Sequence, residues 1–381
     1  MGKKVTIKDI ARELQVSTAT VSRALNGKEG VNSHLQKKVI AKAQEMGYLR
    51  SFYPNLLDAK PKEIAVIFPG NDYFWEKVEQ GVLDAQQLLQ NFGIKLKIFR
   101  TEGHNLAQQN QLLENIFQKE KIDALALVPA DLTQLDYFIN AFYLRRVAVA
   151  TFNVDAPLSK RLFYVGQDLN RAGRVAGKIF ECLCRRREGE IVILTSNKQA
   201  PSHVGRWQGL IDFVHKKHLP LDVSRVVEVK DDEEAYRLTK DKLLEEKKLC
   251  GIFVSTAFGN LGVGRALREK GKKEIVVVGN DLSSEWVPYI KEGLIDCCIF
   301  QAPYWQGYLA LVFLARFLLF KQAFSEKSFF LPVIPIFAEN LDESFLHFEQ
   351  EIARASFLSS QLFEKEGRLT DSQLVQAKPG F

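Results

Sequence analysis

VSTATVSRALNG, from Val16 to Gly27, is the stretch that decides how the first part of this chain folds. Ser17 is a typical N-cap and Asn26-Gly27 a typical stop, so the residues between them predict a helix over 18–25. Val21 and Leu25 fall on its inner face. The side chains left outside, or partly outside in the case of Thr20, are those of Thr18, Ala19, Ser22 and Arg23. Short polar groups and one Arg on a helix face are typical of the second helix of a helix-turn-helix, which enters the major groove of DNA.

The flanking residues predict two more short helices. Thr6 and Asp9 form a capping box that opens a helix over 7–14, and Gln15-Val16 makes the turn. Ser33 and Gln36 form a second capping box, which starts a third helix that ends at Gly47. Three such helices can share one small core, which gives an all-α domain over residues 1–48.

Charge supports the same assignment. Residues 1–60 contain 11 Lys and Arg against 5 Asp and Glu, whereas the whole chain contains 52 against 46. The remaining 321 residues therefore balance to zero, and all the net positive charge lies with the helix-turn-helix. Phosphate binding requires this asymmetry. The alternative is a basic surface on a small helical domain that binds some other partner.

VTIKDIARELQVSTATVSRALNG (5–27) and VNSHLQKKVIAKAQEMGY (31–48) together resemble the headpiece of the lactose-repressor/galactose-repressor (LacI/GalR) family. The resemblance implies that Thr18 and Ala19 read base edges and that the residues after them contact phosphates and bases. The Ala19 methyl offers only an apolar contact, so the operator sequence stays open. The complete set expected at the DNA within the headpiece is Ser17, Thr18, Ala19, Thr20, Ser22, Arg23 and Asn26.

Residues 49–61 follow as a hinge or linker. In the family this segment becomes a short helix on the operator, and the resemblance implies that Leu57 wedges into the minor groove. Pro54 departs from the family pattern and limits such a helix to a start near Tyr53. The alternative for this segment is a plain tether.

Residues 62–342 alternate apolar runs with helical patterns. The runs cover 63–69, 94–100, 123–129, 146–152, 190–196, 224–230, 250–256 and 274–280, and helices are expected over 74–92, 105–119, 171–187, 206–218 and 234–246. Apolar strands separated by helices predict parallel sheets covered on both faces. The fold class is therefore a helix-turn-helix headpiece followed by two doubly wound α/β lobes, whose ligands gather at the carboxyl ends of the strands.

The residues at those strand ends, including PGNDYFWEKVEQG (69–81), FNVDAP (152–157), GRWQG (205–209), VVGNDLS (277–283) and FQAPYWQGYLA (300–310), resemble the periplasmic-binding-protein-like sensor of the same family. The resemblance implies a ligand cleft lined by Asp72, Tyr73, Phe74, Trp75, Asn153, Asp155, Arg206, Asp281 and Gln301. Carboxylates and Arg pair with vicinal hydroxyls, and aromatic faces cover a pyranose ring, so we expect a sugar. A purine or another non-sugar effector is the alternative within the family.

Several of these residues also have purely structural interpretations. One of the three consecutive aromatic residues 73–75 is expected to pack at a helix start, Asp281 could cap a turn, and Arg206 could pair on the surface. For Asp168 we favour an N-cap over ligand contact. The glycines of GNLGVG (259–264) have the reverse of the dinucleotide-binding spacing and indicate close helix packing.

Other classes of function have little support in the sequence. No nucleophile elbow, phosphate-binding loop or metal-spaced His cluster is present, so we expect neither an enzyme nor a cofactor nor a metal, although an enzyme acting on a sugar and an effector-free architectural DNA-binding protein remain alternatives. Five cysteines without zinc spacing and the lack of a signal peptide favour the reduced cytoplasm. LALVFLARFLLF (309–320) is too short to cross a membrane and predicts a buried helix.

The remaining expectations concern assembly. Two subunits should pair through the lobes and place two recognition helices on a palindromic operator. Ligand-driven lobe closure should then change operator affinity in a direction that the sequence does not reveal. The C-terminal extension, 343–381, predicts one more helix to about Phe363 and lacks the heptads of a tetramerising coiled coil.

Overall fold

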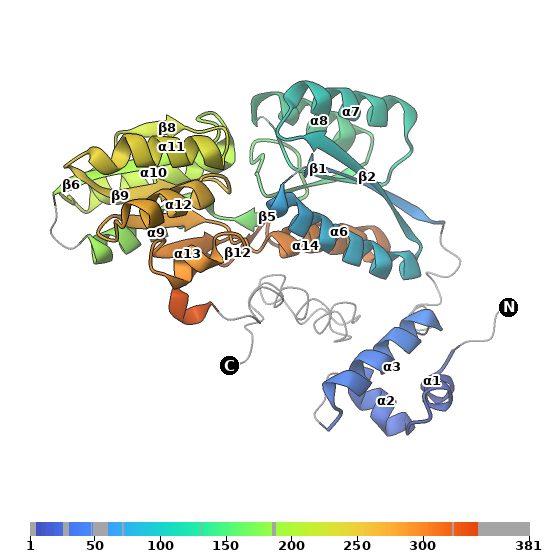
Figure 1. Ribbon diagram of the computed structural model, residues 1–381. Coiled ribbons are helices and arrows are strands. Elements are labelled where there is room, and N and C mark those ends of the chain that lie inside the picture. Colours follow the sequence, from blue (N-terminus) through green and yellow to red (C-terminus); the bar gives the residue numbers. More distant parts are fainter. Residues whose placement is uncertain are drawn as a thin grey trace.

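The computed structural model describes residues 5–25, 30–46, 48, 60–70, 72–130, 132–184, 188–321 and 324–341 (Figure 1). The first helices follow the sequence pattern closely. α1 (Ile7–Glu13) begins with the predicted capping box, in which the Thr6 backbone N–H donates to Asp9 Oδ2 at 2.8 Å. α2 (Thr18–Leu25) is capped by Ser17, whose Oγ accepts from the Thr20 N–H at 3.0 Å. The expected turn and second helix are therefore both present.

The second capping box is a correction. α3 (Ser33–Glu45) is capped one residue earlier than expected, because Asn32 Oδ1 accepts from the Leu35 N–H at 2.7 Å. Gln36 instead donates through Nε2 to the carbonyl oxygen of Ala24 at 3.2 Å, which ties α3 to the end of α2. Gly47, the expected end of α3, lies outside the described residues. The three helices enclose a core that includes Ile10, Val21 and Tyr48.

The first lobe is built on a six-stranded, fully parallel sheet with the order β12-β5-β4-β3-β1-β2. Its strands are β1 (Lys62–Gly70), β2 (Ile94–Glu102), β3 (Ala124–Leu127), β4 (Ala148–Phe152), β5 (Phe163–Gln167) and β12 (Ser328–Leu331). Helices α6 (Tyr73–Leu89) and α14 (Pro303–Phe320) cover one face, and α7 (Leu106–Lys119) and α8 (Leu132–Leu144) cover the other (Figure 1). A 3-10 turn, η1 (Gln90–Phe92), follows α6. Successive β1 residues alternate between the two cores, as the period of a strand requires.

The second lobe has a seven-stranded sheet, parallel except for β13. Its strands are β6 (Gly189–Thr195), β7 (Leu221–Asp222), β8 (Val226–Glu228), β9 (Leu249–Val254), β10 (Val276–Asn280), β11 (Cys297–Phe300) and β13 (Ile334–Ile336). Its helices are α9 (Leu169–Leu183), α10 (Pro201–Lys216), α11 (Asp232–Asp241), α12 (Asn260–Lys270) and α13 (Val287–Lys291), with 3-10 turns η2 (Leu243–Glu245) and η3 (Ala338–Asn340). α9 and α10 share one side of this sheet. The predicted doubly wound lobes are confirmed.

The chain crosses between the lobes three times: from β5 to α9, from β11 to α14, and from β12 to β13. One side chain joins all three crossings. Gln167, at the end of β5, is buried and donates through Nε2 to the carbonyl oxygens of Phe300 at 3.0 Å and Pro332 at 3.2 Å. Any change in the angle between the lobes must therefore pass through segments that Gln167 holds together.

The apolar segment 309–320 belongs to α14, which is longer than the segment suggested. Among the described helices, α14 has the length and composition to cross a membrane, yet most of it is buried inside the protein. It packs chiefly against α6 and the strands of the first lobe. The prediction of a buried lobe helix is confirmed.

Helices α9 and α10 approach so closely that only glycine fits at their contact. A Cβ on Gly173 of α9 would lie 1.9 Å from the Arg206 carbonyl oxygen, and a Cβ on Gly209 of α10 would lie 2.2 Å from that of Asn170. Two reciprocal glycines thus fix the position of α10, which carries part of the site described below.

We expect Gly173→Ala to lower the free energy of unfolding by about 1–3 kcal/mol, because the added methyl overpacks this contact. Urea unfolding followed by circular dichroism measures it. The matched control is Gly70→Ala, whose Cβ would meet its nearest neighbour, in Arg100, at an ordinary 3.6 Å. An equal loss in both variants would contradict the packing argument.

Candidate functional site

The outer face of α2 is the candidate DNA-contacting surface. Thr18, Ala19 and Arg23 are exposed, and Thr20 and Ser22 are half-buried, while Val21 and Ala24 on the opposite face are fully buried. Ser17 and Thr20 are partly committed to the helix start, since their hydroxyl oxygens lie 2.8 Å apart. Two further residues predicted at the DNA, Asn26 and Leu57, lie outside the described residues, as does the segment 49–59 that contains Pro54.

A cavity of about 450 Å³ lies between the two lobes at the carboxyl ends of their strands. Seven of the nine residues predicted for the cleft line it together: Asp72, Phe74, Trp75, Asn153, Arg206, Asp281 and Gln301. They come from both lobes, with Asp72 preceding α6, Asn153 following β4, Asp281 following β10 and Gln301 following β11. The rule that ligands gather at strand ends in such sheets accounts for this convergence.

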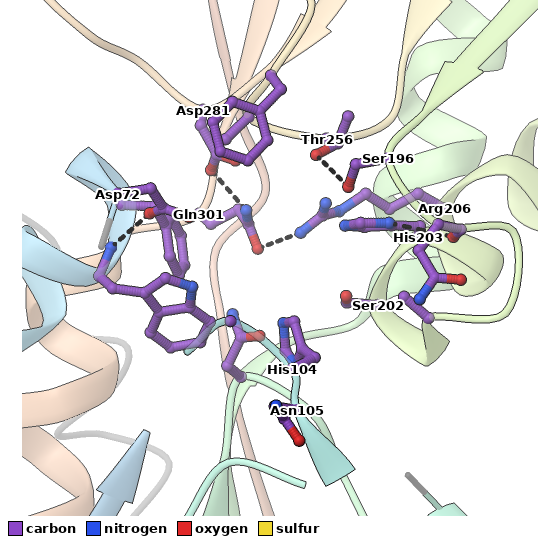
Figure 2. Close-up of a pocket in the computed structure, with 18 of the residues that line it drawn as sticks. Asp72, His104, Asn105, Ser196, Ser202, His203, Arg206, Thr256, Asp281 and Gln301 are labelled. Atoms are coloured by element: carbon purple, nitrogen blue, oxygen red, sulfur yellow. Dashed lines mark hydrogen bonds between the residues drawn. The ribbon is translucent and has the colours of Figure 1, made fainter. Parts of the chain in front are cut away.

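A buried chain of hydrogen bonds organises one end of the cavity. The Arg206 guanidinium donates through Nη1 to the Ser255 carbonyl oxygen at 2.8 Å and through Nη2 to Gln301 Oε1 (Figure 2). Gln301 in turn donates through Nε2 to Asp281 Oδ1 at 2.5 Å. Arg206 is 3% exposed, which excludes the alternative that it forms an ion pair on the protein surface. We call Arg206, Gln301 and Asp281 the charged end.

Burial sets the electrostatics of the charged end. It raises the pKa of Asp281 to about 6, although the neighbouring Arg206 charge and the Gln301 hydrogen bond favour the carboxylate. Burial likewise raises the pKa of Asp72 and lowers the pKa of Arg206. Each shift reflects a charge that has lost water without full compensation. Hydroxyl groups of a ligand would relieve this state by donating to the two carboxylates and accepting from the guanidinium.

Asp72 also has a structural role. Its Oδ1 accepts from the Trp75 N–H at 3.0 Å and so caps α6, which aims Phe74 and Trp75 at the cavity. The two rings meet edge to face with centroids 4.9 Å apart. The combined result is a carboxylate beside apolar ring surface, an arrangement that suits a ligand with one apolar face and a polar rim.

The charged end is connected to the crossings between the lobes. The Gln301 carbonyl oxygen accepts from Gln306 Nε2 at 2.9 Å, and Gln306 Oε1 accepts from Asn153 Nδ2 at 3.0 Å. The Tyr164 hydroxyl lies 3.0 Å from the carbonyl oxygens of both Asn153 and Gln167. All five of these residues are buried. These hydrogen bonds form one network that connects the cavity to Gln167, the residue that joins the three crossings between the lobes.

Two predicted cleft residues are placed elsewhere, which corrects the expected lining. Asp155 accepts from Arg161 Nη2 at 2.7 Å and from Thr151 Oγ1 at 3.2 Å, and so holds the β4–β5 loop. Tyr73 packs edge to face on Trp286 with centroids 4.9 Å apart. Of the three consecutive aromatic residues, Tyr73 is therefore the packing residue. Asp168 is the N-cap of α9, as expected.

The sequence analysis missed the other end of the cavity. The residues there that bear charged, polar or imidazole groups are Glu102, His104, Asn105, Ser196, Asn197, Ser202, His203 and Thr256. Several follow β2, β6 and β9 directly, so the strand-end rule applied to every strand could have found them. Ser202 and His203 were missed because α10 begins at Pro201, five residues before the helix expected from the apolar pattern.

Metal chemistry finds no support in the part of the chain that the structure describes. There, no group of three or more His, Cys, Asp or Glu side chains could hold a metal ion. None of the five cysteines, all within the described ranges, forms a disulfide.

Comparison with known proteins finds a family match for each of the two parts of the chain, the two lobes and the N-terminal helical domain. Residues 64–322 match the family model described as periplasmic binding protein domain, and residues 6–51 match that of bacterial regulatory proteins, lacI family. The catabolite control protein A of Priestia megaterium is 25% identical over 285 residues, covering 73% of this chain and 82% of that protein. The ribose operon repressor of Haemophilus influenzae is 26% identical over 310 residues, covering 77% and 86%.

A solved structure extends the likeness to three dimensions. An ABC transporter solute binding protein from Agrobacterium vitis, solved with bound D-fucose, superposes with a TM-score of 0.65 at 25% identity, covering 75% of this chain and 98% of that one. The chain therefore belongs to the periplasmic binding protein domain family, and with its N-terminal lacI-family domain it is a DNA-binding transcriptional regulator of the LacI family.

Proposed function

We propose that this regulator senses a sugar, which it binds in the interlobe cavity through Asp72, Phe74, Trp75, Asn153, Arg206, Asp281 and Gln301. The observation that carries the proposal is the charged end, where Arg206, Gln301 and Asp281 form a buried hydrogen-bonded chain beside two aromatic rings. Buried carboxylates and amides that converge on a cavity suit vicinal hydroxyls, and the rings suit the C–H face of a pyranose. A ribose operon repressor among the relatives and D-fucose in the similar structure support the same class.

The coupling to DNA follows from the network that joins the cavity to the crossings. A ligand that bonds to Asp281 and Gln301 on one lobe and to Asp72 on the other favours one angle between the lobes. That angle is constrained by Gln167, which holds the three crossings together. We propose that two subunits pair through their lobes, so that lobe closure changes the spacing of two α2 helices on a palindromic operator.

At the DNA we propose that Thr18 and Ala19 face base edges, while Ser17, Thr20, Ser22, Arg23 and Asn26 contact phosphates and bases. Leu57 is proposed as a minor-groove wedge. Because its target is DNA, we place the protein in the cytoplasm. We assign it no catalytic role, in keeping with relatives that are regulators.

A panel of pentoses, hexoses and purines tests the effector class by thermal shift and calorimetry. Binding of at least one sugar raises the melting temperature by mass action. Exclusive binding of a purine would replace the sugar by the other effector class, and silence across the panel would favour a DNA-binding protein without an effector.

Exchanging one residue in each half should separate the two activities. We expect Arg23→Ala to weaken operator binding about ten- to hundredfold and leave effector binding intact. Asp281→Asn should weaken effector binding by a similar factor through loss of a charge-assisted hydrogen bond. Fluorescence anisotropy on an operator selected from random duplexes, with calorimetry for the effector, measures both.

The matched controls remove the same kind of group elsewhere. Arg12→Ala deletes an arginine that is exposed on α1, and Asp241→Asn alters an exposed carboxylate at the end of α11. Each should change its respective affinity far less than the test variant. Loss of both activities in either test variant would contradict the proposed division of labour.

The raised pKa of Asp281 predicts a pH dependence. Sugar hydroxyls donate to the ionised carboxylate, and in the empty cavity the pKa of this group is about 6. Effector affinity should therefore be constant above that pH and fall as the pH drops through 6 towards 5, because the carboxyl must release its proton to accept these bonds. Calorimetry with a neutral sugar from pH 5 to 8 measures it. Asp281→Asn should remove the step, and an unchanged step in that variant would assign it to another group.

A further inference from the structure

The end of the cavity away from Asp281 is lined by several side chains whose hydrogen-bond donors the chain leaves open, together with one carboxylate, Glu102. We call it the donor end and define it by Asn105, Ser196, Asn197, Ser202, His203 and Thr256, with His104 from the first lobe beside them (Figure 2). Its members come from the ends of β6 and β9, from the start of α7 and from the start of α10. The donors that these groups can use for a ligand are those that do not already form hydrogen bonds within the protein.

The first turn of α10 leaves one backbone N–H without an acceptor, that of the cavity-lining residue Ser202. Its N-cap residue, Ala200, has no side chain that could accept a hydrogen bond, and Pro201 has no N–H. The N–H groups of His203 and Val204 both donate to the Ala200 carbonyl oxygen at 3.0 Å. Within the described ranges the N–H of Ser202 has no acceptor, so it remains available, at the positive end of a 16-residue helix.

The Ser202 side chain is a second and independent sign of a ligand. The residue is only 4% exposed, and its hydroxyl makes no hydrogen bond to any part of the chain that the structure describes. Figure 2 shows this oxygen directed into the cavity. A hydroxyl that reaches a cavity and has no protein partner is open to a bound group that accepts from it.

The two amides of the donor end have already used their acceptors. Asn105 Oδ1 accepts from the Gln108 N–H at 3.0 Å, and Asn197 Oδ1 accepts from the Gln199 N–H at 2.8 Å. Because a backbone N–H can only donate, the amide orientation is fixed, and each Nδ2 group is left to donate. The hydroxyls of Ser196 and Thr256 lie 3.3 Å apart, so one donates to the other and one proton remains for a ligand.

The histidines are neutral but can become donors. Burial lowers the pKa of His104 to about 4 and that of His203 to about 3, and the nearby Arg206 charge lowers the latter further. His203 Nδ1 lies 3.3 Å from the Asn197 carbonyl oxygen, which only accepts, so Nδ1 carries the proton and Nε2 is open. A bound anion would favour protonation of both rings. Glu102 is a carboxylate that lines the same cavity and would repel an anion, but it is exposed, so solvent screens its charge.

We propose that the effector is a phosphorylated sugar, with its phosphoryl group at the donor end and its hydroxyls at the charged end. This inference rests on the proposed sugar effector and specifies its class. A second sugar ring would bring hydroxyls without charge, whereas a phosphoryl group brings three acceptor oxygens for the open donors of Ser202 and the two amides, and negative charge for the helix start. The arrangement at the start of α10 is that of an anion site.

The test compares each sugar with its monophosphate. Calorimetry is run with the full chain on glucose, galactose, fructose and ribose, on their monophosphates, and on glucuronate as a carboxylate. We expect at least one monophosphate to bind at least tenfold more tightly than its parent sugar. In Ser202→Ala and in Asn197→Ala the ratio of the two affinities should fall about tenfold, since each loses a hydrogen bond to a charged group.

Control variants lie on the same lobe away from the cavity. His215→Gln, at an exposed position on α10, and Ser224→Ala, at an exposed position before β8, should keep the wild-type ratio. Circular dichroism melting establishes that each variant folds. A ratio that falls equally in controls and test variants would overturn the proposal.

The outcomes separate this inference from the proposed function. Parent sugars that bind as tightly as their monophosphates would overturn the phosphoryl site and leave the sugar sensor in place. Tighter binding of glucuronate than of every phosphate would overturn the phosphoryl assignment in favour of a carboxylate. If no sugar binds, inorganic phosphate decides: at millimolar concentration it should raise the melting temperature of the wild type but not of Ser202→Ala, and no effect on the wild type would overturn the anion site.

Discussion

The arrangement of the cavity depends on one buried guanidinium. Arg206 is almost fully enclosed, and a buried charge is tolerated only when its hydrogen bonds are satisfied. Ser255 and Gln301 supply acceptors for two of its N–H groups, whereas its Nε has no partner among the described residues, and Gln301 in turn donates to Asp281. Displacing any one of these groups would leave a buried charge or amide without its hydrogen-bond partner. The end of β11 and the start of α14 are therefore held in register with α10, and the reciprocal glycines behind α10 hold it against α9.

This coupling explains how a small ligand could bias a whole domain. The carboxylate of Asp281 and the amide of Gln301 belong both to the cavity wall and to the network that ends at Gln167. A ligand that changes the preferred arrangement of these groups changes the relative stability of lobe angles by the same free energy. The effect is reciprocal, so an operator that selects one lobe angle must also alter ligand affinity.

Local sequence patterns correctly predicted those features, such as helix caps and strands, that depend on residues close together in the sequence. Ser17, Thr6 and Asp9 act within three residues of their partners, and all eight apolar runs contain strands of the two sheets. Asp72, Asn153, Asp281 and Gln301 were predicted from the family resemblance of the segments that follow the strands. The resemblance also included Asp155, because the partner of Asp155, Arg161, becomes its neighbour only through the β4–β5 loop. The donor end escaped notice because Ser202 and His203 belong to a first turn whose apolar periodicity starts later, and because open amide donors are visible only in three dimensions.

The three crossings have a consequence for how the polypeptide is made. The second lobe is nearly continuous, from α9 to β11, whereas the first lobe needs α14 and β12, which come more than 130 residues after β5. During translation, strands β6 to β11 of the second lobe are therefore synthesised before the first lobe is complete. Until residues 303–331 emerge, β5 lacks its outer neighbour and α6 lacks the helix it packs against, so apolar surface stays uncovered. The first lobe is therefore started first but stays incomplete while strands β6 to β11 of the second lobe are synthesised.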